Sequence, residues 1–188
     1  MPRFWSRPLK RNNVFKAAYI VTAALLVILC GLWALAFFSM KPPKQQRFLE
    51  KFQTNRAAYE QIRHMIAADQ QIRAVYVDFG VETDSSAVAR PPSEVNFPID
   101  RYRQYVALLH QVGSSAVFQI AGANQPDEAC IGAWGAGWAG DARHIWICWT
   151  TRSPTNRVPN LDEYYRTANR PKDVYKQIDQ SWYLRADW

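Results

Sequence analysis

An uninterrupted apolar segment near the start of the chain constrains its fold more than any other feature. Residues 17–40 read AAYIVTAALLVILCGLWALAFFSM and contain no Asp, Glu, Lys or Arg. An α-helix rises about 1.5 Å per residue, so roughly 20 apolar residues cross the hydrocarbon core of a bilayer. A core helix of a globular domain keeps a polar stripe, which this segment lacks. We therefore predict a single transmembrane helix over residues 17–40.

Two forms of processing are alternatives to an uncleaved anchor. Residues 34–36 (Ala-Leu-Ala) have the small-x-small pattern of a signal-peptidase site. However, the apolar run is longer than the roughly 7–15 residues of a cleaved signal, and Phe37 and Phe38 extend it beyond the cut. Cys30 follows Leu29, whereas a lipoprotein cysteine follows a small residue. We favour an uncleaved anchor and keep cleavage after Ala36 as the alternative.

Basic residues flank the span on both sides in equal number, so a comparison of the two flanks favours one orientation only slightly. Those before it are Arg3, Arg7, Lys10, Arg11 and Lys16, and those after it are Lys41, Lys44, Arg47, Lys51 and Arg56, with Glu50 among them. Cytoplasmic flanks are enriched in Lys and Arg, and long downstream domains cross the membrane largely regardless of charge. We predict a cytoplasmic N-terminus and a periplasmic C-terminal domain at a bacterial inner membrane.

The positive charge of the chain is concentrated next to the span. The formal net charge is +7 overall, made up of +5 in residues 1–40, +4 in residues 41–56 and −2 in residues 57–188. Anionic lipid headgroups are the natural counter-charge at that place. We therefore predict that the lipid bilayer and another protein are the partners, and that nucleic acid is not.

The rest of the chain predicts one α+β domain. We expect a basic segment over residues 1–16, a proline-containing linker over 41–47 and the domain over 48–188. Its sheet is expected to be mainly antiparallel, with about two principal helices on one face. Helical periodicity covers 48–66 with a break at Asn55, and Pro98 and Gly113 bound a second helix. Strands are expected at 72–81, 115–121, 129–134, 143–150 and 182–188, a turn at 124–127, a loop at 82–97, and irregular structure at 152–180 with one short helix capped by Asn160 and Glu163.

Residues 129–134 and 143–150 are predicted to form a β-hairpin. Placing Cys130 opposite Cys148 also places Gly132 opposite Trp146 and Trp134 opposite His144. The other face then pairs Ile131 with Ile147 and Ala133 with Ile145, and this agreement on both faces supports the register. The two cysteines are candidates for a disulfide, as expected outside the cytoplasm. The alternative is a pair of buried thiols.

Tryptophan-rich segments supply the candidate binding residues, which are Trp134, Trp138 and His144. Trp138 lies in the glycine-rich loop between the two hairpin strands, where it cannot easily belong to the core. Tryptophan is frequent at binding hot spots. The acidic residues Asp78, Glu82 and Asp84 fit a solvated loop better than a cation site. We predict no catalytic residue, no metal and no cofactor, since no nucleotide, zinc or nucleophile motif is present.

The function predicted from these features is that of a non-catalytic, membrane-tethered binding module. An immunity-like protein that neutralises a toxin, or one that binds another envelope protein, is a concrete form of it. One alternative is an accessory subunit of a membrane complex whose span packs against other helices. A second is an enzyme with an unrecognised site near the 130–148 hairpin, built on His144 and Asp141.

Overall fold

The computed structural model describes residues 11–39, 41–122, 125–136, 142–165 and 173–187. The chain divides into two compact units, residues 1–41 and 42–188, which are described separately. Trp138, Asp141 and Trp188 lie outside the described residues.

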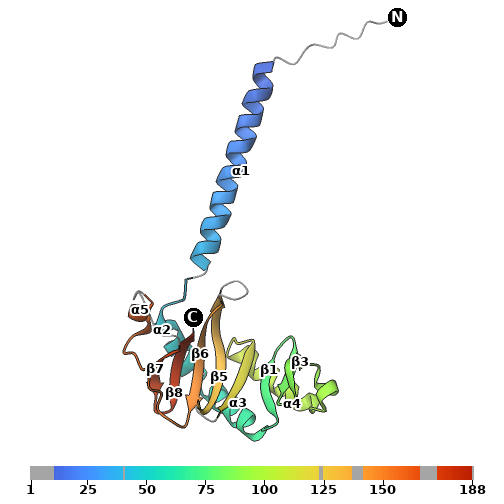
Figure 1. The fold of residues 1–188 in the computed structure, drawn as a ribbon, viewed down its shortest axis with the longest axis vertical. Helices are drawn as coiled ribbons and strands as arrows, with labels where there is room; N and C mark the ends of the chain where they lie inside the picture. The colour runs from blue at the N-terminus through green and yellow to red at the C-terminus, as the bar shows by residue number, and fades with distance from the viewer. Residues whose placement is uncertain (1–10, 40, 123–124, 137–141, 166–172, 188) are drawn as a thin grey trace, which may run out of the picture. The chain divides into compact units, whose positions relative to one another are not determined.

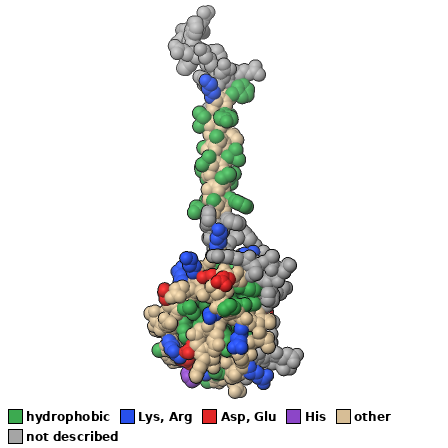
Figure 2. All heavy atoms as spheres, turned by 90° about the vertical axis from the view of Figure 1, so that its left-hand side faces the viewer, with side chains coloured by type: hydrophobic (Ala, Val, Ile, Leu, Met, Phe, Trp, Pro, Cys, Tyr) green, Lys and Arg blue, Asp and Glu red, His purple; other side chains and the backbone are tan. Residues whose placement is uncertain are grey.

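The first unit is the long helix α1, Arg11–Ser39. Its segment Ala18–Leu35 is long and apolar enough to cross a membrane, and in the described part of the chain it is the one helix of that kind. None of this segment is buried, and Figure 2 shows hydrophobic side chains along its length. A signal sequence near an N-terminus has the same properties. The helix is thus compatible with a single membrane anchor or a signal segment.

The second unit is an α+β domain built on one antiparallel sheet (Figure 1). The eight described strands lie in the order β3-β2-β1-β4-β5-β6-β8-β7, and every neighbouring pair is antiparallel. The elements are α2 (Gln45–Thr54), α3 (Arg56–Ala68), β1 (Ile72–Tyr76), β2 (Gly80–Thr83), β3 (Ser86–Arg90), the 3-10 helix η1 (Pro92–Val95), α4 (Ile99–Gln111), β4 (Ala116–Gly122), β5 (Gln125–Ala136), β6 (Arg143–Thr150), α5 (Leu161–Tyr164), β7 (Val174–Asp179) and β8 (Trp182–Asp187). The predicted α+β class is confirmed.

The hydrophobic core lies between one face of the sheet and the helices α2, α3 and α4. The strands contribute alternate residues to it, among them Val75, Val117 and Ile147, which are completely buried. The helices contribute buried residues at helical spacing, such as Tyr59 and Ile62 of α3. Complete burial of such apolar side chains stabilises the fold by about 1.5–3 kcal/mol each. This layer fixes which strand residues face away from the helices.

The predicted boundaries of two helical segments are confirmed. Asn55 separates α2 from α3, as its position on the apolar face predicted, and its side chain donates a hydrogen bond to the carbonyl of Lys51. Helix α4 begins directly after Pro98 and is followed by Gly113 in the left-handed conformation. The buried face of this helix runs through Tyr105 and Leu109, and Ile99 in its first turn is 50% exposed.

The predicted single strand over residues 72–81 is wrong, because it contains a turn. Strand β1 ends at Tyr76, Phe79 is 72% exposed, and β2 begins at Gly80. Gly80 has φ +97°, and a Cβ atom there would lie 2.1 Å from the carbonyl oxygen of Arg90. Only glycine permits this close approach. The approach lets β3 pair with β2 in a region that the sequence pattern assigns to a loop.

Two further differences lie in the second half of the domain. Strand β5 begins at Gln125, where a turn is predicted, and β7 lies in the segment expected to be irregular. The short helix α5 is present, and Asn160 caps it by accepting a hydrogen bond from the Asp162 amide. Isolated alternation patterns of six residues with polar members, such as Val174–Asp179, are weak strand signals.

The hairpin register is confirmed in its first half and wrong in its second. Cys130 lies opposite Cys148, Ile131 opposite Ile147, and Gly132 opposite Trp146. An irregularity between Gly132 and Trp134 then shifts the pairing, so that Trp134 lies opposite Ile145 and Gly135 opposite His144. One extra residue on one strand of a pair is a β-bulge. Because Ala133 is that extra residue, the predicted pairs of Trp134 with His144 and of Ala133 with Ile145 do not form.

Candidate functional site

A row of three aromatic side chains crosses the sheet on the face opposite the helices. Tyr76 of β1, Phe118 of β4 and Trp146 of β6 each follow or precede a buried core residue and therefore point to the other face. The ring centroids of Tyr76 and Phe118 are 5.4 Å apart, and those of Phe118 and Trp146 are 5.0 Å apart. Both pairs are edge-to-face, a favourable geometry worth about 0.5–1.5 kcal/mol each. All three side chains are partly exposed.

A hollow of about 450 Å³ lies on one side of this row. We name it the charged hollow, because its lining includes two arginines and three carboxylates. Its described lining consists of Gln70, Ile72, Arg73, Glu82, Asp84, Phe118, Gln119, Cys130, Trp146, Arg185 and Asp187. Every one of these residues belongs to a strand or to a turn before one.

A second hollow of about 460 Å³ lies on the other side of Phe118 and Trp146. We name it the glycine hollow, and none of its described lining residues is Asp, Glu, Lys or Arg. Its lining consists of Tyr76, Gly113, Ser114, Ser115, Ala116, Phe118, Gly132, Ala133, Trp134, Gly135, His144 and Trp146. A Cβ atom on Gly132 would come within 3.2 Å of the Ser114 hydroxyl, and one on Gly135 within 3.1 Å of the His144 ring. The absence of both Cβ atoms therefore lets the Ser114 hydroxyl and the His144 ring pack closely over the backbone of β5.

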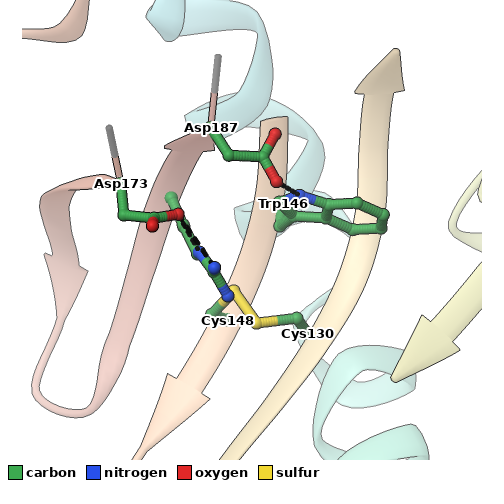
Figure 3. Close-up of a disulfide and its surroundings, with 6 residues drawn as sticks. Cys130, Trp146, Cys148, Asp173 and Asp187 are labelled. Atoms are coloured by element: carbon green, nitrogen blue, oxygen red, sulfur yellow. Dashed lines mark hydrogen bonds and ion pairs between the residues drawn. A yellow bond between two sulfur atoms is a disulfide. The ribbon is translucent and has the colours of Figure 1, made fainter. Parts of the chain in front are cut away.

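The carboxylate of Asp187 positions both Trp146 and His144. Its Oδ2 accepts a hydrogen bond from the Trp146 indole Nε1 at 3.1 Å (Figure 3). Its Oδ1 accepts one from the His144 amide at 3.0 Å and lies 3.2 Å from the His144 ring Nδ1. The three residues lie on adjacent strands, since His144 and Trp146 alternate along β6 and Asp187 pairs with His144 from β8. Fixed rotamers of this kind are typical of a preformed binding surface.

The disulfide joins Cys130 to Cys148 across β5 and β6 on this same face. Figure 3 shows it beside Trp146 and Asp187. Both cysteines are almost completely buried, and Cys130 contributes to the lining of the charged hollow. The predicted disulfide is therefore present, and it links the two strands that supply half of the lining residues of the glycine hollow.

Both arginines of the charged hollow form ion pairs, whereas the carboxylate of Glu82 contacts a tyrosine hydroxyl. Arg73 pairs with Asp84 at 2.8 Å, and Arg185 pairs with Asp173 at 2.9 Å. Glu82 instead accepts a hydrogen bond from the Tyr76 hydroxyl at 3.2 Å. Burial, and then the adjacent Glu82 carboxylate, raise the pKa of Tyr76 to about 12. The phenol therefore stays a neutral donor at physiological pH.

Two of the sequence-predicted binding residues lie close in the hairpin but on opposite faces of the sheet: Trp134 lies opposite the buried Ile145 and packs against the hydrophobic core, whereas the His144 ring lies beside that of Trp146. Trp134 and His144 both line the glycine hollow. The structure adds Tyr76, Phe118 and Asp187, which the tryptophan count did not indicate. Their signal in the sequence is the alternation of β1, β4 and β8, which places each of them beside a residue of the buried face.

The histidine and carboxylate geometry resembles that of a general base, but the adjacent hydroxyl group is committed elsewhere. His144 is held by Asp187, as a general base often is. Ser114 lines the same hollow, yet its hydroxyl donates to the carbonyl of Ala116 and accepts from the amide of Ala116. A nucleophile would need that hydroxyl to be in contact with the base. The Ser114 hydroxyl is therefore not placed as a nucleophile activated by His144. Within the described residues, no group of three or more His, Cys, Asp or Glu side chains is arranged to hold a metal ion.

No protein-family model, no curated protein and no solved structure matches this chain.

Proposed function

We propose that this chain is a non-catalytic, membrane-tethered binding module on the outer side of a bacterial inner membrane. The aromatic row and the two hollows form its binding surface, and the partner is another protein. Neutralisation of a toxin, or attachment to another envelope protein, is the concrete form of this activity. The single observation that carries the proposal is the partly exposed row of Tyr76, Phe118 and Trp146 on the face opposite the helices.

The placement in a membrane and outside the cytoplasm draws on two independent features. The side chains of Ala18–Leu35 are unburied, and such a surface is stable when lipid covers it. The disulfide fits an oxidising compartment, because cytosolic thiols are kept reduced.

The basic residues after the span also have structural roles within the domain. Lys51 donates to the carbonyl of Gly113, and Arg56 pairs with Asp179. Packing within the domain explains their presence there, independently of topology.

The role in binding draws on the chemistry of the face. Aromatic side chains carry a disproportionate share of binding energy in protein interfaces, especially in preformed pockets near the centre of the surface. Trp146 and Phe118 form the ridge between two hollows of nearly equal volume. Asp187 fixes the Trp146 ring, so little conformational entropy is lost when a partner covers it. A partner that covers the ridge would bury both rings.

The membrane topology is tested with fusions to the C-terminus of the full chain. Alkaline phosphatase is active only outside the cytoplasm, whereas green fluorescent protein folds when it stays inside. We expect phosphatase activity without fluorescence, and a membrane fraction that resists extraction with sodium carbonate. Fluorescence without phosphatase activity would overturn the external placement. Release of a shortened chain into the soluble fraction would show cleavage after Ala36 in place of anchoring.

The binding surface is tested by capture of partners from detergent extracts of cells that express the full chain. We compare the wild type with Phe118→Ala and Trp146→Ala, since Phe118 removes a ring without removing a hydrogen bond. Gln104→Ala on the exposed side of α4 is the control. A partner retained by the wild type and the control should be lost from both aromatic variants. Equal recovery of every partner by all four proteins would refute the assigned surface.

A further inference from the structure

We propose that a basic stripe on helix α2, formed by Lys44, Arg47 and Lys51, binds the phosphate groups of anionic phospholipids at the membrane surface where the span ends. This inference goes beyond the binding surface of the sheet, and it rests on the membrane anchoring of the chain. It is carried by the spacing of the three cations, by the lack of a carboxylate partner for them among the described residues, and by their short distance along the chain from the span.

The three cations lie on one side of α2, next to its buried face. Lys44 is the N-cap of the helix, and Arg47 and Lys51 follow it at positions i+3 and i+7, which share one side of an α-helix. Phe48 and Phe52 bury the neighbouring side in the core, so the direction of the stripe is fixed. Lys44 and Arg47 are exposed, and Lys51 is partly exposed.

The stripe is not neutralised by the described part of the domain. Lys44 and Arg47 form no ion pair with a described carboxylate. Lys51 donates one hydrogen bond to the uncharged carbonyl of Gly113 at 2.9 Å. Burial, and then the adjacent Arg47 guanidinium, lower the pKa of Lys51. Two cations of the stripe are therefore close enough to repel each other, and like charges four residues apart destabilise a helix.

The carboxylates near α2 are engaged in other contacts. Glu50 accepts a hydrogen bond from the Gln46 side chain at 3.1 Å, and Asp162 accepts one from the first backbone amide of α2 at 2.9 Å. The first turn of α2 contains no acidic residue, although the N-terminus of a helix favours anions and disfavours cations. The two exposed cations at this end thus face a single carboxylate, and phosphate groups would remove the remaining repulsion.

The covalent chain keeps the two exposed cations close to the membrane. Lys44 follows Met40, the last residue of the predicted span, by four positions, and Arg47 follows it by seven. A chain extends at most about 3.6 Å per residue, so the Lys44 backbone lies within about 15 Å of the end of the span, and one helical turn adds about 5 Å for Arg47. The headgroup layer is about 5–8 Å thick, and the electrostatic attraction reaches about 8–10 Å beyond it. Packing within the domain does not account for these two residues, whereas lipid phosphate does.

The test uses the full chain, labelled with nitrogen-15 lysine, in nanodiscs in which phosphatidylglycerol replaces phosphatidylcholine in steps. The readout is the nuclear magnetic resonance signal of the Lys51 amide, assigned as the one missing in Lys51→Arg, which keeps the charge. We expect a saturable shift as the share of phosphatidylglycerol rises. The shift should be reversed at about 1 M salt, where the screening length falls to about 3 Å. Inorganic phosphate added to discs of phosphatidylcholine alone should leave the signal in place.

Matched variants connect the shift to the stripe. Arg47→Gln removes one cation, and we expect about fivefold more phosphatidylglycerol to be needed for half of the shift, the effect of one basic residue at an anionic surface. Arg152→Gln makes the same change at an exposed position after β6 and should leave the half-point unchanged. No shift with phosphatidylglycerol, an unchanged half-point in Arg47→Gln, or an equal shift with inorganic phosphate would overturn the inference. If the chain still resists carbonate extraction in that case, the anchoring stands and only the docking of α2 is lost.

Discussion

Reduction of the Cys130–Cys148 disulfide should lower the stability of the domain by an amount that follows from the chain itself. The two cysteines are 18 residues apart in sequence. Closing a loop of that size removes conformational entropy from the unfolded chain worth about 3 kcal/mol at 25 °C. The native sheet keeps its register without the bond, because neighbouring pairs of β5 and β6 flank the cysteines on both sides. Reduction should therefore lower the stability by raising the entropy of the unfolded chain, and it should leave the native fold intact.

The assay is unfolding of a Cys30→Ser variant in detergent, with and without a reductant. The substitution removes the other thiol of the chain, so reduction alters only the pair of interest. For a domain of this size, about 3 kcal/mol corresponds to a fall of roughly 6–12 °C in the unfolding midpoint. Reduced and oxidised samples should give the same far-ultraviolet circular dichroism before heating. Coincident midpoints, or a loss of strand signal on reduction at low temperature, would refute this reasoning.

Three more substitutions probe the core, the turn and the phenol of the site. Leu184→Ala removes a completely buried side chain of β8 and should destabilise the domain by about 2–5 kcal/mol in urea unfolding; a cost below 1 kcal/mol would contradict its place in the core. Gly80→Ala should cost more than about 1 kcal/mol, because φ is +97° and the new Cβ would meet the carbonyl of Arg90; a neutral result would show that the turn differs. Tyr76 should ionise near pH 12, two units above an ordinary tyrosine, in the difference between ultraviolet titrations of the wild type and Tyr76→Phe. Since its folded pKa is raised, its contribution to stability is complete below pH 10 and is lost as the pH rises towards 12; a titration centred on pH 10 would contradict the burial of this phenol and its contact with Glu82.

The elements that could be predicted from the sequence are those whose patterns are local and uninterrupted. The apolar helix, the break at Asn55, the strand Arg143–Thr150 and the Cys130–Cys148 pairing all follow from residue spacing within a short window. The turn at Gly80 could not be predicted, because its necessity comes from Arg90, a residue ten positions later that packs against it. The positions of glycine residues alone do not reveal such contacts.

The candidate site was predicted only in part for a similar reason. Trp134 and His144 lie within one hairpin and both line the glycine hollow, but the bulge at Ala133 turns Trp134 to the face of the buried Ile145. Asp187 lies 43 positions after His144 and reaches it only because β8 pairs with β6. Tyr76 joins the row through a strand order in which β1 is next to β4. Long-range strand order is set by the whole fold and leaves no signal in a short window.

The most direct test of the central claim is photo-crosslinking in intact cells of the organism that makes this chain. A photoreactive phenylalanine analogue replaces Phe118 on the aromatic row or Gln104 on the exposed side of α4, in the full-length protein. The account predicts one adduct of defined mass from position 118 that disappears when Trp146 is also changed to Ala, and no such adduct from position 104. Adducts of equal yield from both positions, or from neither, would contradict the assignment of this face as the binding surface.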